Sequence, residues 1–252
     1  MKVRSATGWY PSLGFTSDDC MTDATTSAAR GFWLRHAIIP LAIALGLIAL
    51  FGLTDLDRWL ATRWAWDAAA GQFIAHDSLL ANSIVHRGGR VAIWAVALIC
   101  LIGWLVNRRR DGALSRAFGF SLIALALSIG VAAGLKQITN VDCPWDLQGF
   151  GGDRPYVHLF ADRPDDLPTA KCYPAAHSSS GFALFALYFG FRNTHRRVAL
   201  ASLAAALITG GIFGLAQQAR GAHFLSHDLT SAMLTWFVCL GLYVRVLWHS
   251  KY

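Results

Sequence analysis

Charged side chains are scarce in this sequence of 252 residues. Asp, Glu, Lys and Arg together make up 15% of it, against about 25% in ordinary soluble domains. So few charges cannot solvate the surface of a soluble globular protein of this size. Hydrophobic residues make up 55%, which excludes intrinsic disorder. No collagen-like repeat is present, and five cysteines are too few for a disulfide scaffold.

Six long apolar runs contain most of the hydrophobic residues. They are Ile38–Thr54, Val91–Asn107, Ala117–Leu135, Ala176–Phe191, Val198–Ala216 and Leu229–Trp248. A helix crosses a bilayer with about 20 mainly apolar residues, and hydrophobicity on all sides exceeds what a buried helix of a soluble protein needs. The sequence therefore predicts an all-α bundle of six transmembrane helices.

The net charge of +7 is compatible with contact to nucleic acid, a membrane surface or a phosphorylated substrate. Most Lys and Arg residues lie in the termini and in the short connectors, including Arg108–Arg110 and Arg192–Arg197. Positive residues mark cytosolic segments, so both termini are expected inside the cell and the long loops 55–90 and 136–175 outside. The short Arg108–Arg110 connector offers no fold that would present a nucleic-acid site, so no nucleic-acid partner is expected.

The first thirty residues are rich in Ser and Thr and have no apolar central stretch of the kind found in secretory signals. We expect residues 1–36 to be a flexible cytosolic tail and residues 37–252 to be a single membrane domain. No internal repeat and no second soluble domain are expected.

Three outer segments carry polar residues that a passive bundle does not need. They run from Lys136 to Asp146, from Cys172 to Gly181 and from Gln217 to Asp228. In the six-span topology all three lie at the same membrane face. Ionisable groups near a bilayer are costly and are candidates for function.

The side-chain types in these segments suit phosphate chemistry. Lys136 and Arg220 are cations suited to phosphate oxygens. His177, His223 and His227 act as nucleophile, acid or base near neutral pH. His177 lies near a helix start, where backbone N–H groups favour an anion. Beside a bilayer, this combination indicates phosphoryl transfer on a lipid phosphate.

Each residue also has a simpler interpretation. Lys136 alone is consistent with snorkelling to the interface, Arg220 with anchoring a span end and His177 with a water-facing helix start. His223 and His227 are spaced like metal ligands on one helical face. A third ligand and the Glu of a zinc-protease motif are missing, so no metal is expected.

The three segments resemble the signature motifs of the type 2 phosphatidic acid phosphatase family, membrane relatives of acid phosphatases and vanadium haloperoxidases. The family's Lys, six residues, Arg-Pro becomes Lys136, six residues, Cys143-Pro144, and its Pro-Ser-Gly-His becomes Pro174-Ala175-Ala176-His177. In its Ser-Arg, five residues, His, three residues, Asp motif, Gln217 stands at the Arg position and His227 at the Asp position, with His223 as the shared histidine.

The resemblance implies that His223 attacks phosphorus to form a phosphohistidine, that His177 protonates the leaving oxygen and that Lys136 holds the phosphate. Because two motif arginines are missing, we expect Arg220 to enter the site, with Arg154 or Arg163 as helper. His227 or Asp228 is expected to orient His223, and Ser178 or backbone N–H groups to replace the motif serine. No cofactor or metal is implied.

Cys143 and Cys172 both lie in outer segments, each within two residues of a motif proline. In an oxidising compartment we expect a disulfide between them that ties the first motif segment to the second; the alternative is two free thiols. Trp59, Trp64 and Trp66 in the first outer loop indicate either an interfacial aromatic belt or a lid over a lipid headgroup.

The sequence thus predicts a phosphatase of the bacterial inner membrane that acts on a lipid phosphate or pyrophosphate at the periplasmic face, with the lipid substrate and the bilayer as its partners. A lipid phosphotransferase, a catalytically silent lipid-phosphate binding relative and a metal-dependent hydrolase are the alternatives. Oligomeric state and the particular lipid are not predicted.

Overall fold

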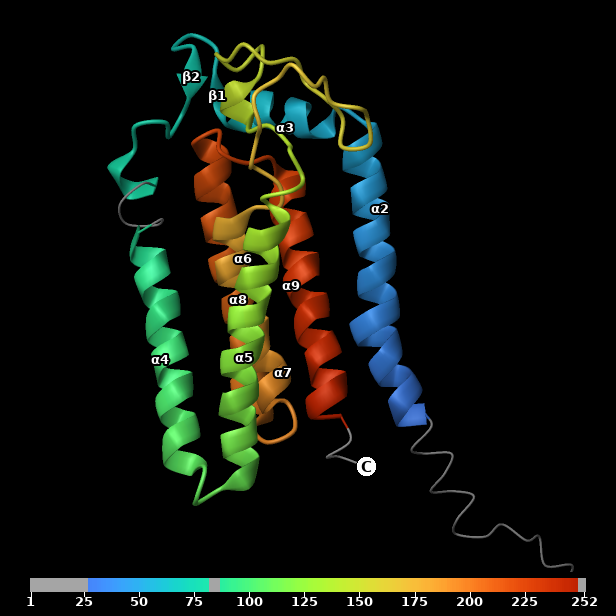
Figure 1. Cartoon of the computed structure of the whole chain (residues 1–252), viewed down its shortest axis with the longest axis vertical. Helices are drawn as coiled ribbons and strands as arrows, with labels where there is room; N and C mark the ends of the chain where they lie inside the picture. The colour runs from blue at the N-terminus through green and yellow to red at the C-terminus, as the bar shows by residue number, and fades with distance from the viewer. Residues whose placement is uncertain (1–26, 82–86, 249–252) are drawn as a thin grey trace, which may run out of the picture. The chain divides into compact units, whose positions relative to one another are not determined.

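Residues 27–81 and 87–248 are described by the computed structural model of the chain, and they are mostly helical (Figure 1). The chain divides into two compact units, Met1–Ile39 and Pro40–Tyr252, and the candidate site lies within the second. In chain order the elements are η1 (Leu34–Ile38), α2 (Ile39–Leu53), α3 (Leu56–Trp64), β1 (Trp66–Asp67), β2 (Gln72–Phe73), α4 (Gly89–Asn107), α5 (Gly112–Leu135), η3 (Pro144–Asp146), α6 (Ala176–Phe182), α7 (Phe185–Phe191), α8 (Arg196–Ala219) and α9 (Leu225–Val246).

Five helices within the described residues are long and apolar enough to cross a membrane. They are Ser27–Leu53, Gly89–Asn107, Gly112–Leu135, Arg196–Ala219 and Leu225–Val246, which coincide with five of the six predicted runs. Large apolar side chains on them are exposed, as for Trp94 (71%), Leu98 (55%) and Ile208 (60%). Contiguous apolar exposure of this kind suits lipid rather than water. The chain is therefore a helical membrane protein.

The first of these helices begins earlier than the apolar pattern indicated. It starts at Ser27 rather than near Ile38, so residues 27–36 of the predicted tail are helical. Within this first unit, Nε of Arg35 donates to the carbonyl oxygen of Gly31 at 3.0 Å, as a helix allows for residues four apart. Residues 1–26 of the predicted tail lie outside the described residues.

The predicted fourth span is two short helices rather than one. α6 ends at Phe182 and α7 begins at Phe185, and each has seven residues. At the break, the N–H groups of Leu184, Ala186 and Leu187 bond carbonyls three residues back, so the chain winds more tightly there. The run reads as one apolar segment in sequence, yet neither piece alone is long enough to cross a bilayer.

α6 and α7 are nevertheless central to the second unit, since they pack against α5, α8 and α9 (Figure 1). α6 crosses α8 closely at a pair of glycines: a Cβ on Gly181 would lie only 2.6 Å from the backbone nitrogen of Gly210. Small residues let helix backbones approach in this way in membrane proteins. The close crossing fixes the start of α6, and His177 with it.

The long predicted outer loops gather at one end of the second unit. The end of α5, the starts of α6 and α9 and the end of α8 meet there, beneath α3 and the short β1–β2 hairpin (Figure 1). This hairpin is an addition to the predicted all-α fold. An aromatic cluster that includes Phe73, Phe150 and Phe224 joins the hairpin, the second loop and the α8–α9 connection. The arginine-rich connectors lie at the opposite ends of the helices.

Candidate active site

Backbone hydrogen bonds hold the three motif segments together. The N–H of Cys172 donates to the carbonyl oxygen of Val141 at 3.1 Å, which joins the first segment to the second. The N–H of Trp145 donates to the carbonyl oxygen of Gly221 at 3.0 Å, which joins the first to the third. Gly221 has φ +78°, a conformation that glycine adopts without strain. Segments up to about 80 residues apart in sequence are thus fixed as one polar end of the bundle.

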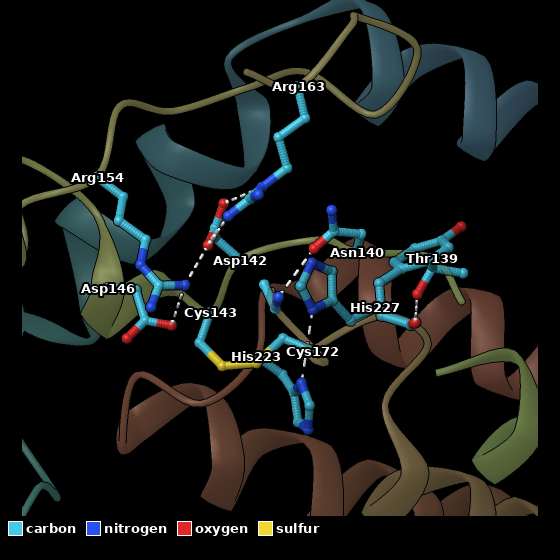
Figure 2. Close-up of a disulfide and its surroundings, with 12 residues drawn as sticks. Thr139, Asn140, Asp142, Cys143, Asp146, Arg154, Arg163, Cys172, His223 and His227 are labelled. Carbon is cyan, nitrogen blue, oxygen red and sulfur yellow. Dashed lines mark hydrogen bonds and ion pairs between the residues drawn. A yellow bond between two sulfur atoms is a disulfide. The ribbon is translucent and has the colours of Figure 1, made fainter. Parts of the chain in front are cut away.

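Cys143 and Cys172 are joined by a disulfide (Figure 2). Their Cα atoms lie 5.2 Å apart, and both side chains are buried. The bridge connects Cys143, at the position of the missing motif arginine, to the segment that leads into His177.

His223 and His227 form a buried pair. Their Nδ1 atoms lie 3.5 Å apart, and the side chains are 6% and 3% exposed (Figure 2). If Nδ1–H of His223 donates to Nδ1 of His227, Nε2 of His223 keeps its lone pair. Burial lowers the pKa of His223 well below 6.5, and the nearby His227 and Lys136 lower it further. His223 is therefore a neutral imidazole at pH 7, as a nucleophile requires.

His223 opens onto a cavity of about 1520 Å³, here called the cation-lined cavity. Its polar end is lined by Lys136, His177, Gln217, Arg220 and His223. Arg87, Arg90 and Lys171, which are exposed, also line it. No Asp or Glu is among its described lining residues. A cavity with five cations and no carboxylate attracts an anion.

The rest of the cation-lined cavity is apolar. α4 contributes Ile93, Trp94 and Ala97, and α5 contributes residues from Leu122 to Gly130. At a rise of about 1.5 Å per residue, the lining stretch of α5 from Leu122 to Gly130 is about 12 Å long. The cavity thus combines a cationic end with a long hydrocarbon wall.

Lys136 and Arg220 are the partly buried cations of the cation-lined cavity, among its described lining residues. Burial lowers the pKa of the Lys136 ammonium and that of the Arg220 guanidinium. Nη1 of Arg220 donates to Oε1 of Gln217 at 3.0 Å, whereas its buried Nε has no acceptor. A partly desolvated cation with an unsatisfied donor is suited to bind a ligand oxygen.

His177 lies at the start of α6, with its ring stacked on Phe213 at a centroid distance of 4.6 Å. It lines the cation-lined cavity opposite the third segment, as does Ser180. Ser178, which sequence analysis proposed as a phosphate ligand, is fully buried, and its Oγ donates to the carbonyl oxygen of Ala175. Within the described residues, therefore, the serine that reaches the cavity is Ser180.

Asp228 does not contact His223. Its buried carboxylate accepts a hydrogen bond from Nε2 of Gln218 at 2.7 Å. Of the two residues predicted to orient His223, the structure brings His227 to it and pairs Asp228 with α8.

Arg154 and Arg163 lie away from the cation-lined cavity, because Asp142 binds both (Figure 2). Nη1 of Arg154 lies 2.6 Å from Oδ1 of Asp142, and Nε of Arg163 lies 3.0 Å from Oδ2. Burial alone would raise the pKa of Asp142, but these hydrogen bonds outweigh it, so the pKa is lowered. The two arginines predicted as phosphate helpers are thus committed to a carboxylate that stabilises the outer loop.

Asp57 is a candidate that sequence analysis missed. It lies on α3, is 5% exposed and accepts a hydrogen bond from the backbone N–H of Ser226 at 3.1 Å. Asp57 and His227 line one cavity of about 100 Å³, here called the small cavity. Asp57 precedes Ser226 by 169 residues, so no local pattern connects them.

The aromatic residues of the first outer loop differ from one another. Trp66 packs edge-on against Phe73 and Phe150, whereas Trp59 and Trp64 are 57% and 38% exposed. In the described part of the chain, no group of three or more His, Cys, Asp or Glu residues is arranged to hold a metal ion.

A membrane helix bundle with a histidine pair, a third histidine and cations around one cavity defines a protein that handles an anionic group at a bilayer. The model of the PAP2 superfamily matches residues 116–251, which include all three motif segments. The chain belongs to the PAP2 superfamily, whose members are phosphatases. Comparisons with curated proteins and with solved structures found no significant match.

Proposed function

We propose that the chain is a membrane phosphatase that removes phosphate from a phosphorylated lipid. The observation that carries the proposal is the cation-lined cavity, in which His223, His177, Lys136 and Arg220 share one space with a long apolar wall. A soluble phosphate ester has no use for that wall, whereas an acyl or prenyl chain does. The shape and chemistry of the cavity therefore support a lipid whose phosphate lies against the histidines.

In the proposed reaction, Nε2 of His223 attacks phosphorus and the bond from phosphorus to the lipid oxygen breaks. His177 gives a proton to that oxygen, and a phosphohistidine remains. Water then attacks phosphorus and gives a proton to the now deprotonated His177, the P–N bond breaks and inorganic phosphate leaves. Lys136 and Arg220 stabilise the charge on the phosphoryl oxygens in both steps, which is the main requirement of phosphoryl transfer. No metal takes part in these steps.

His227 orients the nucleophile. By accepting a hydrogen bond from Nδ1–H of His223, it directs Nε2 toward the cation-lined cavity. The carboxylate of a hydrolase triad has the same effect on its histidine, and its loss is costly because the wrong tautomer forms. The contact distance of 3.5 Å allows this role.

The proposed topology has six crossings, with α6 and α7 together as the fourth. Both termini are then cytosolic and the site faces the periplasm of a bacterial inner membrane. Arg108–Arg110 and Arg192–Arg197, at the helix ends away from the site, support this orientation. The disulfide between Cys143 and Cys172 supports it as well, because disulfides persist in oxidising compartments.

The proposal is tested by measuring the release of inorganic phosphate by the purified protein from a panel of lipid phosphates. The panel includes phosphatidic acid, phosphatidylglycerol phosphate, a polyprenyl diphosphate and lipid A phosphates. We expect release of inorganic phosphate from at least one of them, and background release by H223A. H177A is expected to lower kcat by about 100- to 10,000-fold, the usual contribution of general acid catalysis.

H76A is the matched control, because His76 is an exposed loop residue that pairs with Asp77 at 3.0 Å. It is expected to keep the activity of the unaltered chain. Equal background release by the unaltered chain and H223A would indicate a silent binding protein instead. Transfer of phosphate to a second lipid in place of water would identify a phosphotransferase.

A further inference from the structure

The exchange of a motif carboxylate for His227 leaves a charge problem at the histidine pair. When Nε2 of His223 bonds to phosphorus, its imidazole ring becomes positively charged. A neutral His227 accepts the Nδ1 hydrogen bond but brings no negative charge to the pair. Lys136 and Arg220, which line the same cavity as His223, add to the positive charge. A carboxylate near His227 would offset it.

Asp57 is placed to do so. Its carboxylate binds the N–H of Ser226, the residue that precedes His227, and the two side chains line the small cavity together. Tyr173 links them further: its ring packs edge-on against His227 at 5.2 Å, and the charge of Asp57 contributes to raising the pKa of the Tyr173 hydroxyl. Asp57 is thus within electrostatic range of groups that touch His227.

The other ionisable groups around the small cavity do not supply a free negative charge. Asp142 is paired with Arg154 and Arg163. Tyr156, Tyr173 and His158 complete the ionisable lining. Tyr156 and Tyr173 stay neutral at pH 7, because burial raises the pKa values of both hydroxyls. Among the described residues, no Lys or Arg forms an ion pair with Asp57.

The carboxylate of Asp57 also disfavours folding near neutral pH. Burial raises its pKa from 3.8 to about 6. The contribution of such a group to stability is present below pH 3.8 and is lost as the pH rises through 6. Groups that reduce stability and persist are concentrated at functional sites.

We infer that Asp57 is the positioning residue that replaces the missing motif carboxylate, by supplying negative charge to the His223–His227 pair from α3. The inference rests on the proposed function. As the P–N bond forms and the lipid oxygen leaves with the proton of His177, the positive charge is shared by the two imidazoles. Asp57 stabilises that charge across the small cavity. No proton has to reach Asp57 for the step to balance.

The test compares D57N, D55N and the double variant D57N/H227D with the unaltered chain. Asp55 is an exposed carboxylate two residues away, so D55N is the matched control. We expect D57N to lower kcat by about 10- to 100-fold with little change in KM, because one charge near the developing positive charge is lost. D55N should leave kcat unchanged. D57N/H227D, which restores a carboxylate at position 227, should regain at least about 10-fold over D57N.

Two further readouts separate this role from a purely structural one. Asn at position 57 still accepts the Ser226 hydrogen bond and carries no charge, so Tm at pH 8 should be equal to or above that of the unaltered chain. The fall in kcat between pH 7 and pH 5, where Asp57 becomes protonated, should be smaller in D57N. Loss of Tm and kcat together, without recovery in D57N/H227D, would overturn the inference, as would unchanged kcat in D57N.

Phosphate release by H223A is measured alongside each of these variants. If the unaltered chain and H223A release phosphate equally from every lipid, the proposed function fails and the inference falls with it. If they differ and D57N behaves like D55N, the inference alone is wrong.

Discussion

The two cavities that meet at the histidine pair have opposite characters. The cation-lined cavity, on the side of His223, is large, mostly apolar and without described carboxylates. The small cavity, on the side of His227, is lined by Asp57 and by the ion pair of Asp142 with Arg163. The pair therefore separates a side that attracts an anion from a side that holds negative charge. In the proposed reaction, the nucleophile His223 lies between these two sides. Changing either side, or the disulfide beside the pair, should therefore change the activity.

Among the cations of the cation-lined cavity, Arg220 is expected to give the largest effect when it is removed. R220A deletes a partly buried cation whose Nε has no protein acceptor, so kcat/KM should fall by about 100- to 1000-fold, as for loss of one preorganised donor at a transition state. R154A provides the comparison, because Arg154 is bound to Asp142 outside the cavity. It should lower Tm and leave kcat/KM within a few-fold. An equal loss of activity in both variants would show that Arg154 also reaches the phosphate.

A smaller effect is expected from removing the disulfide between Cys143 and Cys172. C143S/C172S removes a cross-link that closes a loop of about 30 residues, worth about 3 kcal/mol of unfolding free energy in the chain-entropy model. Tm should therefore fall. Because the bridge ties the first motif segment to the second, kcat should also fall, by about 10-fold.

Dithiothreitol is the control for that prediction. It should reproduce the loss in the unaltered chain and have no further effect on C143S/C172S. Mass spectrometry without reductant should find Cys143 and Cys172 protected from alkylation, and alkylation of both would contradict the bridge.

The smallest effect is expected at the exposed end of the cation-lined cavity. Arg90 and Lys171 are solvent-exposed, so their charges are screened by salt. R90A and K171A should raise KM for a polyprenyl diphosphate by about 3- to 10-fold, and less for the corresponding monophosphate, which carries less charge. The difference should shrink at high salt. R109A, in the connector between α4 and α5, is the control and should change neither KM.

Much of the fold follows from the sequence. The runs that became α4, α5, α8 and α9 are apolar over bilayer length, so hydropathy alone locates them to within a few residues. The break between α6 and α7 does not follow, because Gly, Ala and Phe there read as a continuous apolar helix. Packing against α8 at Gly181 and Gly210 is a tertiary feature that no window along the chain contains.

The candidate site, too, follows from the sequence only in part. Lys136, His177 and His223, which stand at motif positions, line one cavity, and Arg220, which stands at none, lines it as well. The predicted phosphate-binding role of Arg154 depended on its side chain being available, and the sequence does not show that Asp142 binds it. Asp57 was missed because it lies on α3, outside the three motif segments, and belongs to no motif. Long-range pairing of single charged residues is the part that local reasoning does not reach.

The apolar wall between α4 and α5 has a consequence for kinetics. A substrate whose tail remains in the hydrocarbon layer while its phosphate reaches His223 never becomes a solute. Its effective concentration is a mole fraction of the surrounding lipid, and diluting the membrane with inert lipid slows turnover even when the total amount of substrate is constant. Adding buffer should have no such effect. With the proposed lipid substrate, the size of the membrane, rather than the volume of the compartment, would set how often the site is filled.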